Sequence, residues 1–469
     1  MSIERALETL AQRWPQTLED LSELVRIPGV SATPPPCPEL RRSAEATVRL
    51  MEEAGLTGCE VIDFPGGHPY AYGEWLGAEG APTLLLYGHH DVQPPGRPEK
   101  WVTPAFEPTL REDGRLYGRG AVDDKAGVMV HLAACAAWLK GAGALPVNVK
   151  FVVEGEEEAG SPSLAAFLET YRERLAADVI VLTDTANLEA GLPSLTTSLR
   201  GQASVDVEVQ GIDHPIHSGM WGGAVPDATL ALCKAIAALT DEAGGVTLGE
   251  VDAQVRPLSP GERADLEALP YDEAAFKRDT GMEPGAQVIG DPGTPVWGRI
   301  FRAPSVSVTA FESRPLEGST NQIVESARAR ISVRVVPDQD PQAVQDALVA
   351  HFEAKVPWGL TVRVSRRHTA GWWICEAEGP AFEAAREAMA AGFGREAAVI
   401  GCGGSIPFVE PFARVLGGVP ALLMGVEDPP CNAHGENESL NLEDFEKAAR
   451  AAVYLYEALG RRVEAARRP

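Results

Sequence analysis

Carboxylate and imidazole side chains collect directly after four apolar runs of this 469-residue chain. The runs TLLLY, VKFVV, VIVLT and VPALLMGV are typical of buried strands. Where parallel strands lie side by side in an open α/β sheet, their carboxyl ends meet at one edge. The residues expected at that edge are His89, Asp91, Glu157, Glu158, Asp184 and, after a loop, His434, joined by Asp123 at the start of a helix.

Such a group of carboxylates needs cations, because like charges a few ångströms apart raise one another's pKa. Imidazole and carboxylate without thiolate suit two divalent ions, Zn²⁺ or Mn²⁺. The pair of ions would balance the ligating carboxylates together with a bridging hydroxide, which is the nucleophile that metal-assisted hydrolysis requires. In HHD, His89 and Asp91 lie on the same side of an extended chain, so Asp91 can orient the ring of His89 while His90 faces away.

The elements that must position these residues alternate between helical and extended patterns. Helices are expected over 3–26, 39–54 and 123–142, and strands over 83–87, 147–153 and 178–183. This alternation predicts an α/β fold, with a mixed, largely parallel sheet flanked by helices. After Gly201 the pattern becomes that of antiparallel strands, as in SVDVEVQ. We therefore expect a metal-binding domain formed by 1–200 and 375–469, interrupted by an inserted α+β domain at 201–374.

The composition of the chain bears on which partners it can bind and in which cellular compartment it is expected. A net charge of −26 repels phosphate backbones and argues against nucleic acid. No apolar stretch is long enough to span a bilayer, and the N-terminal pattern lacks the apolar segment of a secretory signal, so a cytoplasmic location is predicted. The 7 cysteines form no CxxC pair, which suits free thiols in a reducing compartment.

Several motifs then resemble one known family. YGHHDVQPP, WVTPAFEP, LYGRGAVDDKAG, EGEEEAGS, TDT, HSG, GGSIP and AHGENE follow one another in the order seen in the M20 family of clan MH metallopeptidases. The versions present here are most similar to the branch of carnosine and cytosolic nonspecific dipeptidases. The resemblance implies a fold of the dizinc exopeptidase type, with the inserted domain acting as a lid and dimerisation domain.

The resemblance also implies a role for each clustered residue. One metal ion would be bound by His89, Asp123 and Asp184, and the other by Asp123, Glu158 and His434, with Asp123 bridging the two. Glu157 would be the general base, and Asp91 would be the partner of His89. The peptide bond between Asp123 and Asp124 is expected to be cis.

In the inserted domain, the resemblance gives His217 a role in stabilising the oxyanion, from across the interface of a homodimer formed through the lid. The positions that would handle a small peptide substrate, mainly its carboxylate, are Asn321, Arg334, Gly404 and Ser405. One departure concerns this site. Relatives usually read REGGSIP, whereas this chain reads GCGGSIP, with Gly401 and Cys402 in place of arginine and glutamate.

The sequence thus predicts a two-metal exopeptidase that hydrolyses the peptide bond of dipeptides, using a metal-bridging hydroxide and a glutamate base. The alternative within the family is a deacylase of N-acetyl or N-succinyl amino acids, and outside it a metal-binding scaffold without activity. A serine hydrolase is disfavoured because neither Ser218 nor Ser405 lies in a GxSxG motif. A nucleotide loop at Gly118 is disfavoured because the third glycine of that fingerprint is missing.

Overall fold

A nine-stranded sheet organises the larger layer of the computed structural model, which describes residues 2–404 and 409–467. Its parallel centre runs β6-β3-β7-β17, and antiparallel pairs flank it on both sides. The strands are β1 (Thr57–Ile62), β2 (Tyr70–Trp75), β3 (Thr83–His89), β6 (Asn148–Glu154), β7 (Val179–Leu182), β8 (Ser194–Leu199), β15 (Trp373–Ile374), β16 (Ala398–Cys402) and β17 (Ala421–Leu423). The mixed α/β fold predicted from the sequence is confirmed.

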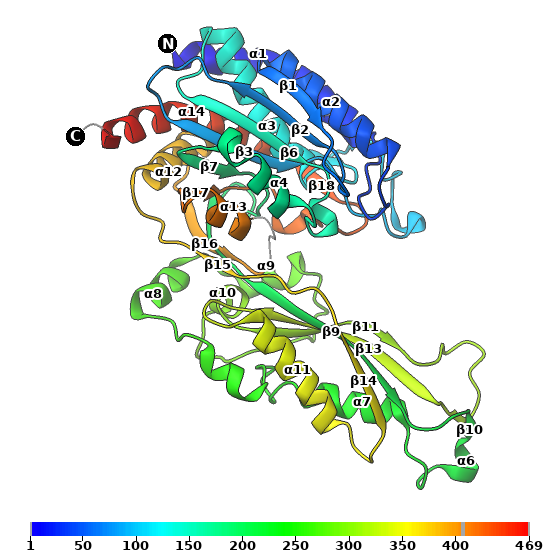
Figure 1. The fold of residues 1–469 in the computed structure, drawn as a ribbon. Coiled ribbons are helices and arrows are strands. Elements are labelled where there is room, and N and C mark those ends of the chain that lie inside the picture. Colours follow the sequence, from blue (N-terminus) through cyan, green and yellow to red (C-terminus); the bar gives the residue numbers. More distant parts are fainter. Residues whose placement is uncertain (1, 405–408, 468–469) are drawn as a thin grey trace.

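Successive side chains of β3 pack on opposite faces of this sheet, as the period of a strand requires. Leu84 and Leu86 join the core beneath one set of helices, and Leu85 and Tyr87 join the core of the opposite face. The first set comprises α1 (Ile3–Val25), α2 (Pro38–Ala54), α3 (Lys125–Ala136), α12 (Pro380–Phe393) and α14 (Leu442–Arg467), and the second comprises α4 (Leu164–Thr170), α5 (Arg172–Leu175) and α13 (Val409–Val415). Both layers are visible in Figure 1. The helix expected at 123–142 is α3 with a π-helical turn at 137–142.

A second, antiparallel sheet forms the inserted part of the chain, with the order β11-β13-β9-β14. Its strands are β9 (Gly201–Gln210), β11 (Ser305–Glu312), β13 (Ser326–Val335) and β14 (Thr361–Arg366). The helices α7 (Ala228–Ala237) and α11 (Pro341–Lys355) cover one face around a separate apolar core. At the end farthest from the large sheet lie β10 (Ile216–His217), β12 (Gln322–Ile323) and α6 (Ser218–Trp221), as Figure 1 shows.

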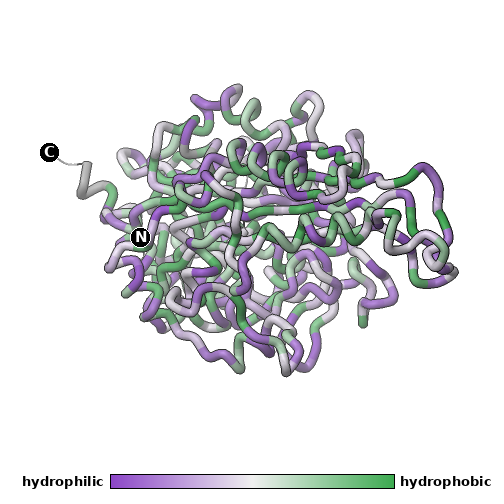
Figure 2. The backbone as a smooth tube through the Cα atoms, turned by 90° about the horizontal axis from the view of Figure 1, so that it is seen from below, coloured by the Kyte–Doolittle hydropathy of each residue, from purple (hydrophilic) through white to green (hydrophobic). Residues whose placement is uncertain are grey.

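Three short helices lie between the two sheets: α8 (Pro260–Ala268), α9 (Glu273–Asp279) and α10 (Val296–Phe301). A small sheet of β4 (Thr109–Leu110), β5 (Arg115–Tyr117) and β18 (Ser439–Asn441) joins distant parts of the larger layer. Apolar and polar stretches alternate at short intervals along the tube in Figure 2. Among the described helices, none combines the length and apolar character needed to cross a membrane.

Candidate metal centre

The Asp123 carboxylate lies between two imidazole rings. Its Oδ1 is 3.1 Å from His89 Nε2, and its Oδ2 is 3.0 Å from His434 Nε2. His434 Nε2 is also 3.1 Å from Glu158 Oε2, and His89 Nε2 is 3.8 Å from Asp184 Oδ1. The structure therefore brings together the five residues expected to hold two ions, with Asp123 at the centre.

Each of these residues follows a strand or begins a helix at the same edge of the large sheet. His89 ends β3, Asp184 comes two residues after β7, and Glu158 lies in the turn after β6. Asp123 lies two residues before the start of α3, and His434 follows β17 after a loop. The parallel pairing of β3 with β6 and β7 is what aligns these ends.

Asp91 connects the two halves of the cluster. His89 Nδ1 lies 3.1 Å from the Asp91 backbone oxygen and 3.3 Å from its carboxylate, so Nδ1 carries the proton and Nε2 is left to bind a metal. The same carboxylate accepts the backbone N–H groups of Glu157 and Glu158, at 3.2 and 3.0 Å. Burial raises the pKa of Asp91, but the bond and charge of His89, a bond from Ser31 and the charge of His90 together lower it below its ordinary value.

The two adjacent glutamates, Glu157 and Glu158, lie in a short 3₁₀ turn, Glu157–Ala159. Gly160 ends it with a φ of 88°, a conformation that costs glycine little and other residues more. His90 points elsewhere, since its Nε2 donates to the backbone oxygen of Pro69 at 2.9 Å.

The donor set fits divalent cations. The ligand atoms of Asp123, Glu158 and His434 all lie within 4.8 Å of one another, and so do those of His89, Asp124 and Asp184. Burial raises the pKa of the Glu157, Glu158 and Asp184 carboxyls, and neighbouring carboxylates raise it further. Such a group holds its negative charge only beside positive charge. The His434 side chain is 58% exposed, which leaves one side of the cluster open to a substrate.

Two carboxylates that the sequence analysis did not assign also face the cluster. Asp124 Oδ2 accepts the backbone N–H of His89 at 3.1 Å, and its Oδ1 is buried without a hydrogen bond. Glu427 forms a third group with Asp123 and Asp184, and burial raises its pKa to about 8. The expected cis peptide between Asp123 and Asp124 is present.

A buried ion pair ties the His434 loop to the Asp123 segment. Arg119 Nη1 lies 2.6 Å from Glu438 Oε2, and the two side chains are 2% and 1% exposed. Arg119 Nη2 donates to the backbone oxygen of His434, at 3.0 Å, where the backbone has a φ of 64°. Glu438 Oε1 accepts the N–H of Asp123 at 3.3 Å. The GRG and AHGENE motifs are therefore parts of one brace.

Comparison with known proteins agrees with this arrangement. Residues 85–458 match the description of peptidase family M20/M25/M40. A cysteinylglycine-S-conjugate dipeptidase of Corynebacterium striatum is 36% identical over 375 residues, which is 79% of each chain. A β-Ala-His dipeptidase of Homo sapiens is 30% identical over 366 residues, covering 76% of this chain and 71% of the relative. The chain belongs to the M20/M25/M40 peptidase family.

The solved structure of human carnosine dipeptidase 1 superposes with a TM-score of 0.85 and 25% sequence identity, covering 98% of this chain and 99% of that one. The likeness spans both sheets, because it covers nearly the whole chain. The predictions of an M20 family member and of a peptidase are confirmed.

The residues expected to stabilise the oxyanion or bind the substrate fall into two separate places. His217 and Asn321 lie together at the far end of the antiparallel sheet β11-β13-β9-β14, called the lid sheet below. There the Asn321 backbone oxygen accepts the N–H of Ser218 at 2.9 Å. The cluster of metal ligands in the same chain does not include His217. Arg334 and Gly404 instead lie near Arg200, beside the large sheet. Ser405 is outside the described residues.

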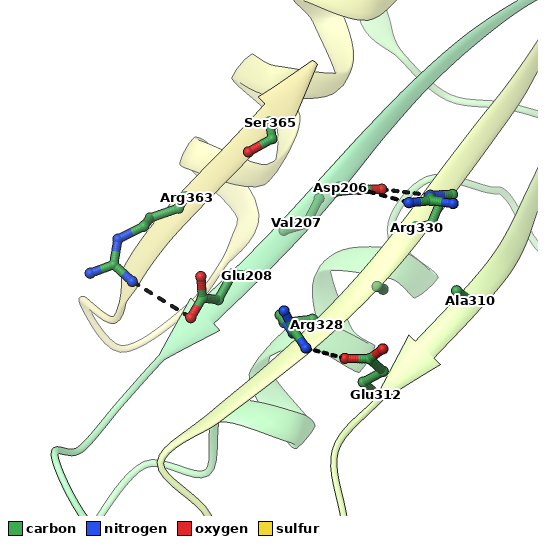
Figure 3. A pocket seen from close by; sticks show the side chains of 10 residues that line it. Asp206, Val207, Glu208, Ala310, Glu312, Arg328, Arg330, Arg363 and Ser365 are labelled. Atoms are coloured by element: carbon green, nitrogen blue, oxygen red, sulfur yellow. Dashed lines mark hydrogen bonds and ion pairs between the residues drawn. The ribbon is translucent and has the colours of Figure 1, made fainter. Parts of the chain in front are cut away.

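A hollow of about 330 Å³ lies on the face of the lid sheet that α7 and α11 do not cover (Figure 3). Its charged side chains pair across neighbouring strands: Arg330 with Asp206, Arg363 with Glu208, and Arg328 with Glu312. Cross-strand ion pairs of this kind are typical of a solvated sheet face. The lining has no imidazole among its described residues, so the cluster around Asp123 is the candidate site.

Proposed function

We propose that this M20 peptidase is a two-metal exopeptidase that hydrolyses dipeptides. The observation that carries the proposal is the position of the Asp123 carboxylate, with one oxygen beside His89 and the other beside His434. A carboxylate held in this way can bridge two ions. Relatives named as dipeptidases support the choice of substrate.

The residues fit the two ions as follows. His89, Asp123 and Asp184 would hold one, and Asp123, Glu158 and His434 the other. When bound, Zn²⁺ or Mn²⁺ would supply Lewis acidity, which polarises the scissile carbonyl and acidifies a water molecule.

Glu157 is the proposed general base. Its backbone N–H donates to Asp91 Oδ1 at 3.2 Å, and its half-buried carboxyl lies among the carboxylates of Glu158, Asp91 and Asp123. A carboxylate in this position can take a proton from an attacking water and return it to the leaving amine. Its neighbour Glu158 has a metal-binding role, so the two glutamates have separate tasks.

The substrate carboxylate is proposed to bind near Arg334 and Gly404. Burial and the neighbouring Arg334 guanidinium lower the pKa of Arg200 to about 10, so two cations lie close together in this region. Arg200 is held by the backbone oxygen of Gly403 at 2.8 Å. The guanidinium groups of Arg200 and Arg334 would donate hydrogen bonds to a substrate carboxylate placed beside them.

We also propose that the site is completed by a second copy of the chain. His217 Nδ1 accepts the N–H of Gly219 at 3.1 Å, which leaves Nε2–H to donate to an oxyanion. The strand β11 forms one edge of the lid sheet and exposes Val308 and Phe311, by 45% and 43%. An unpaired, apolar edge suits pairing with another chain. In this arrangement residues 1–200 and 375–469 form the catalytic domain, and 201–374 the lid.

The decisive experiment compares Glu157→Gln with wild type in metal-loaded protein. We expect hydrolysis of Ala-Ala to fall by about 10²-fold or more while bound metal is unchanged, because the base is lost and the ligands remain. Glu154→Gln is the matched control. It is a buried glutamate of the same segment whose Oε2 accepts the Tyr87 hydroxyl at 2.5 Å, and its activity should persist. Normal turnover by Glu157→Gln would refute the mechanism.

Two further assays separate the alternatives. N-acetyl and N-succinyl amino acids, offered beside Ala-Ala, distinguish a deacylase from a dipeptidase. Mixing inactive Glu157→Gln and His217→Ala chains tests the shared site, since hybrid dimers would contain one intact site. Activity that does not return on mixing would contradict the proposed dimer.

A further inference from the structure

A cavity of about 800 Å³ opens directly beside the metal cluster. It lies between the strand-end loops of the large sheet and the short helices α9 and α10 of the inserted part. Glu427 belongs both to its wall and to the group formed with Asp123 and Asp184. A substrate held at the cluster would therefore place a neighbouring side chain at the mouth of this cavity.

Aromatic rings form the wall contributed by the inserted part. Trp297 stacks on Phe301 with ring centroids 5.6 Å apart, and Tyr271 and Phe276 each lie 6.2 Å from Trp297. The indole N–H of Trp297 donates to the backbone oxygen of Pro270 at 2.9 Å, so its ring faces the cavity with its polar atom satisfied. Rings arranged in this way favour another ring or a large aliphatic group.

Phe301 and Ser198 leave no room for a side chain at position 401. A Cβ atom built on Gly401 would come within 2.6 Å of Phe301 Cβ and 2.6 Å of Ser198 Oγ. No side chain fits there unless Phe301, which is 6% exposed and part of an apolar cluster, moves. The packing of this aromatic wall therefore requires glycine at position 401.

The charges around the cavity disfavour an acidic substrate side chain. Among the described residues that line it, none is lysine, arginine or histidine. Two of its carboxylates are already paired outside the cavity, Asp428 with Arg115 at 2.6 Å and Glu189 with Arg395 at 2.9 Å. A buried carboxylate of the substrate would find no partner charge here.

We propose that this cavity is the side-chain subsite of the enzyme and that it selects dipeptides with a large apolar, above all aromatic, residue. The inference rests on the proposed function and adds the substrate class. Burial of a phenyl ring against these walls would raise kcat/KM about ten- to a hundredfold over that of a methyl group.

The test measures kcat/KM of the metal-loaded full chain for Ala-Ala and for Phe, Asp and Lys placed in turn at each position of an alanine dipeptide. We expect Phe to be preferred about tenfold or more in at least one position, with Asp the poorest. Ala275→Trp, which fills the cavity from α9, should reduce the Phe-to-Ala ratio about tenfold. Ala274→Trp is the matched control, because Ala274 is next to Ala275 on the same helix but is exposed and does not line the cavity.

The outcomes separate the two proposals. If no dipeptide of the panel is hydrolysed, the proposed function fails and the subsite falls with it. If Ala-Ala is hydrolysed but Phe gains nothing in either position, or if Lys or Asp is preferred, the subsite alone is refuted. It is also refuted if Ala275→Trp and Ala274→Trp leave the Phe-to-Ala ratio equally unchanged.

Discussion

Replacing Asp91 by asparagine tests whether one carboxylate aligns both halves of the site. Its two oxygens accept the N–H groups of Glu157 and Glu158 and contact Nδ1 of His89. Asparagine has nearly the same shape but only one acceptor oxygen. Its amide nitrogen must therefore face at least one of these N–H donors.

The expected loss follows from this count of donors. A buried N–H group left without an acceptor costs about 1–3 kcal/mol. The cost can be relieved only by moving the turn or the imidazole, and each movement displaces a proposed ligand or the proposed base. Loss of such a partner of a metal-binding histidine lowers metal affinity or activity about 10- to 100-fold, or about 1.4–2.8 kcal/mol. The two ranges agree.

The assay has two readouts. Calorimetric titration of the apo chain with Mn²⁺ gives the metal Kd, and Ala-Ala hydrolysis at saturating metal gives kcat/KM. Asp444→Asn is the control, because Asp444 is also buried and accepts a backbone N–H, that of Gly191 at 2.7 Å, away from the cluster. If Asp91→Asn keeps both its metal Kd and its kcat/KM within twofold of wild type, the role assigned to Asp91 is wrong.

Three more perturbations follow from contacts described above. Arg119→Leu should lower the free energy of unfolding by about 3–5 kcal/mol in urea melts, because Glu438 would be left as an unpaired buried charge. The control is Arg330→Leu, which breaks the exposed pair with Asp206 in Figure 3 and should leave the midpoint of the urea melt nearly unchanged. Burial lowers the pKa of His131 to about 3 from an ordinary 6.5, so stability present above pH 6.5 is lost as pH falls toward 3, by up to about 1.4 kcal/mol per pH unit. His131→Gln should lose its free energy of unfolding less steeply between pH 6.5 and 3 than wild type, and equal slopes would contradict this. Removal of metal by a chelator should lower the melting temperature, and Zn²⁺ or Mn²⁺ at 100 times its Kd should restore about 2.7 kcal/mol; a melt indifferent to metal would argue against the centre.

The strand ends could be predicted because apolar runs and the polar residues after them are local features of the sequence. His89 and Asp184 follow β3 and β7 without a long loop, so the pairing of these strands fixes their distance. His434 is expected at the same edge, but its exact position depends on the loop that follows β17. The brace of Arg119 and Glu438 that fixes this loop joins residues 319 positions apart.

Other parts of the site could not be predicted, for a physical reason. Glu427 follows β17, but the sequence does not predict it as part of the site, because a single carboxylate before Asp-Pro-Pro has no distinctive spacing. In the aromatic wall, only Trp297 and Phe301 have the i, i+4 spacing of one helix, and no local pattern joins them to Tyr271 and Phe276. These side chains converge only through the packing of short helices between the two sheets.

The separate tasks of Glu157 and Glu158 depend on the geometry of the turn that carries them. In an extended strand, adjacent side chains point to opposite faces, so only one of the two could face the cluster. In a 3₁₀ turn, adjacent side chains are rotated by about 120°, and both can border the same site from different directions. Glu158 Oε2 reaches His434, while the carboxyl of Glu157 experiences the charges of Asp91 and Asp123. Because Asp91 binds the N–H groups of both glutamates, the same carboxylate that orients the His89 ring also sets the angle between the proposed ligand of the second metal and the proposed base.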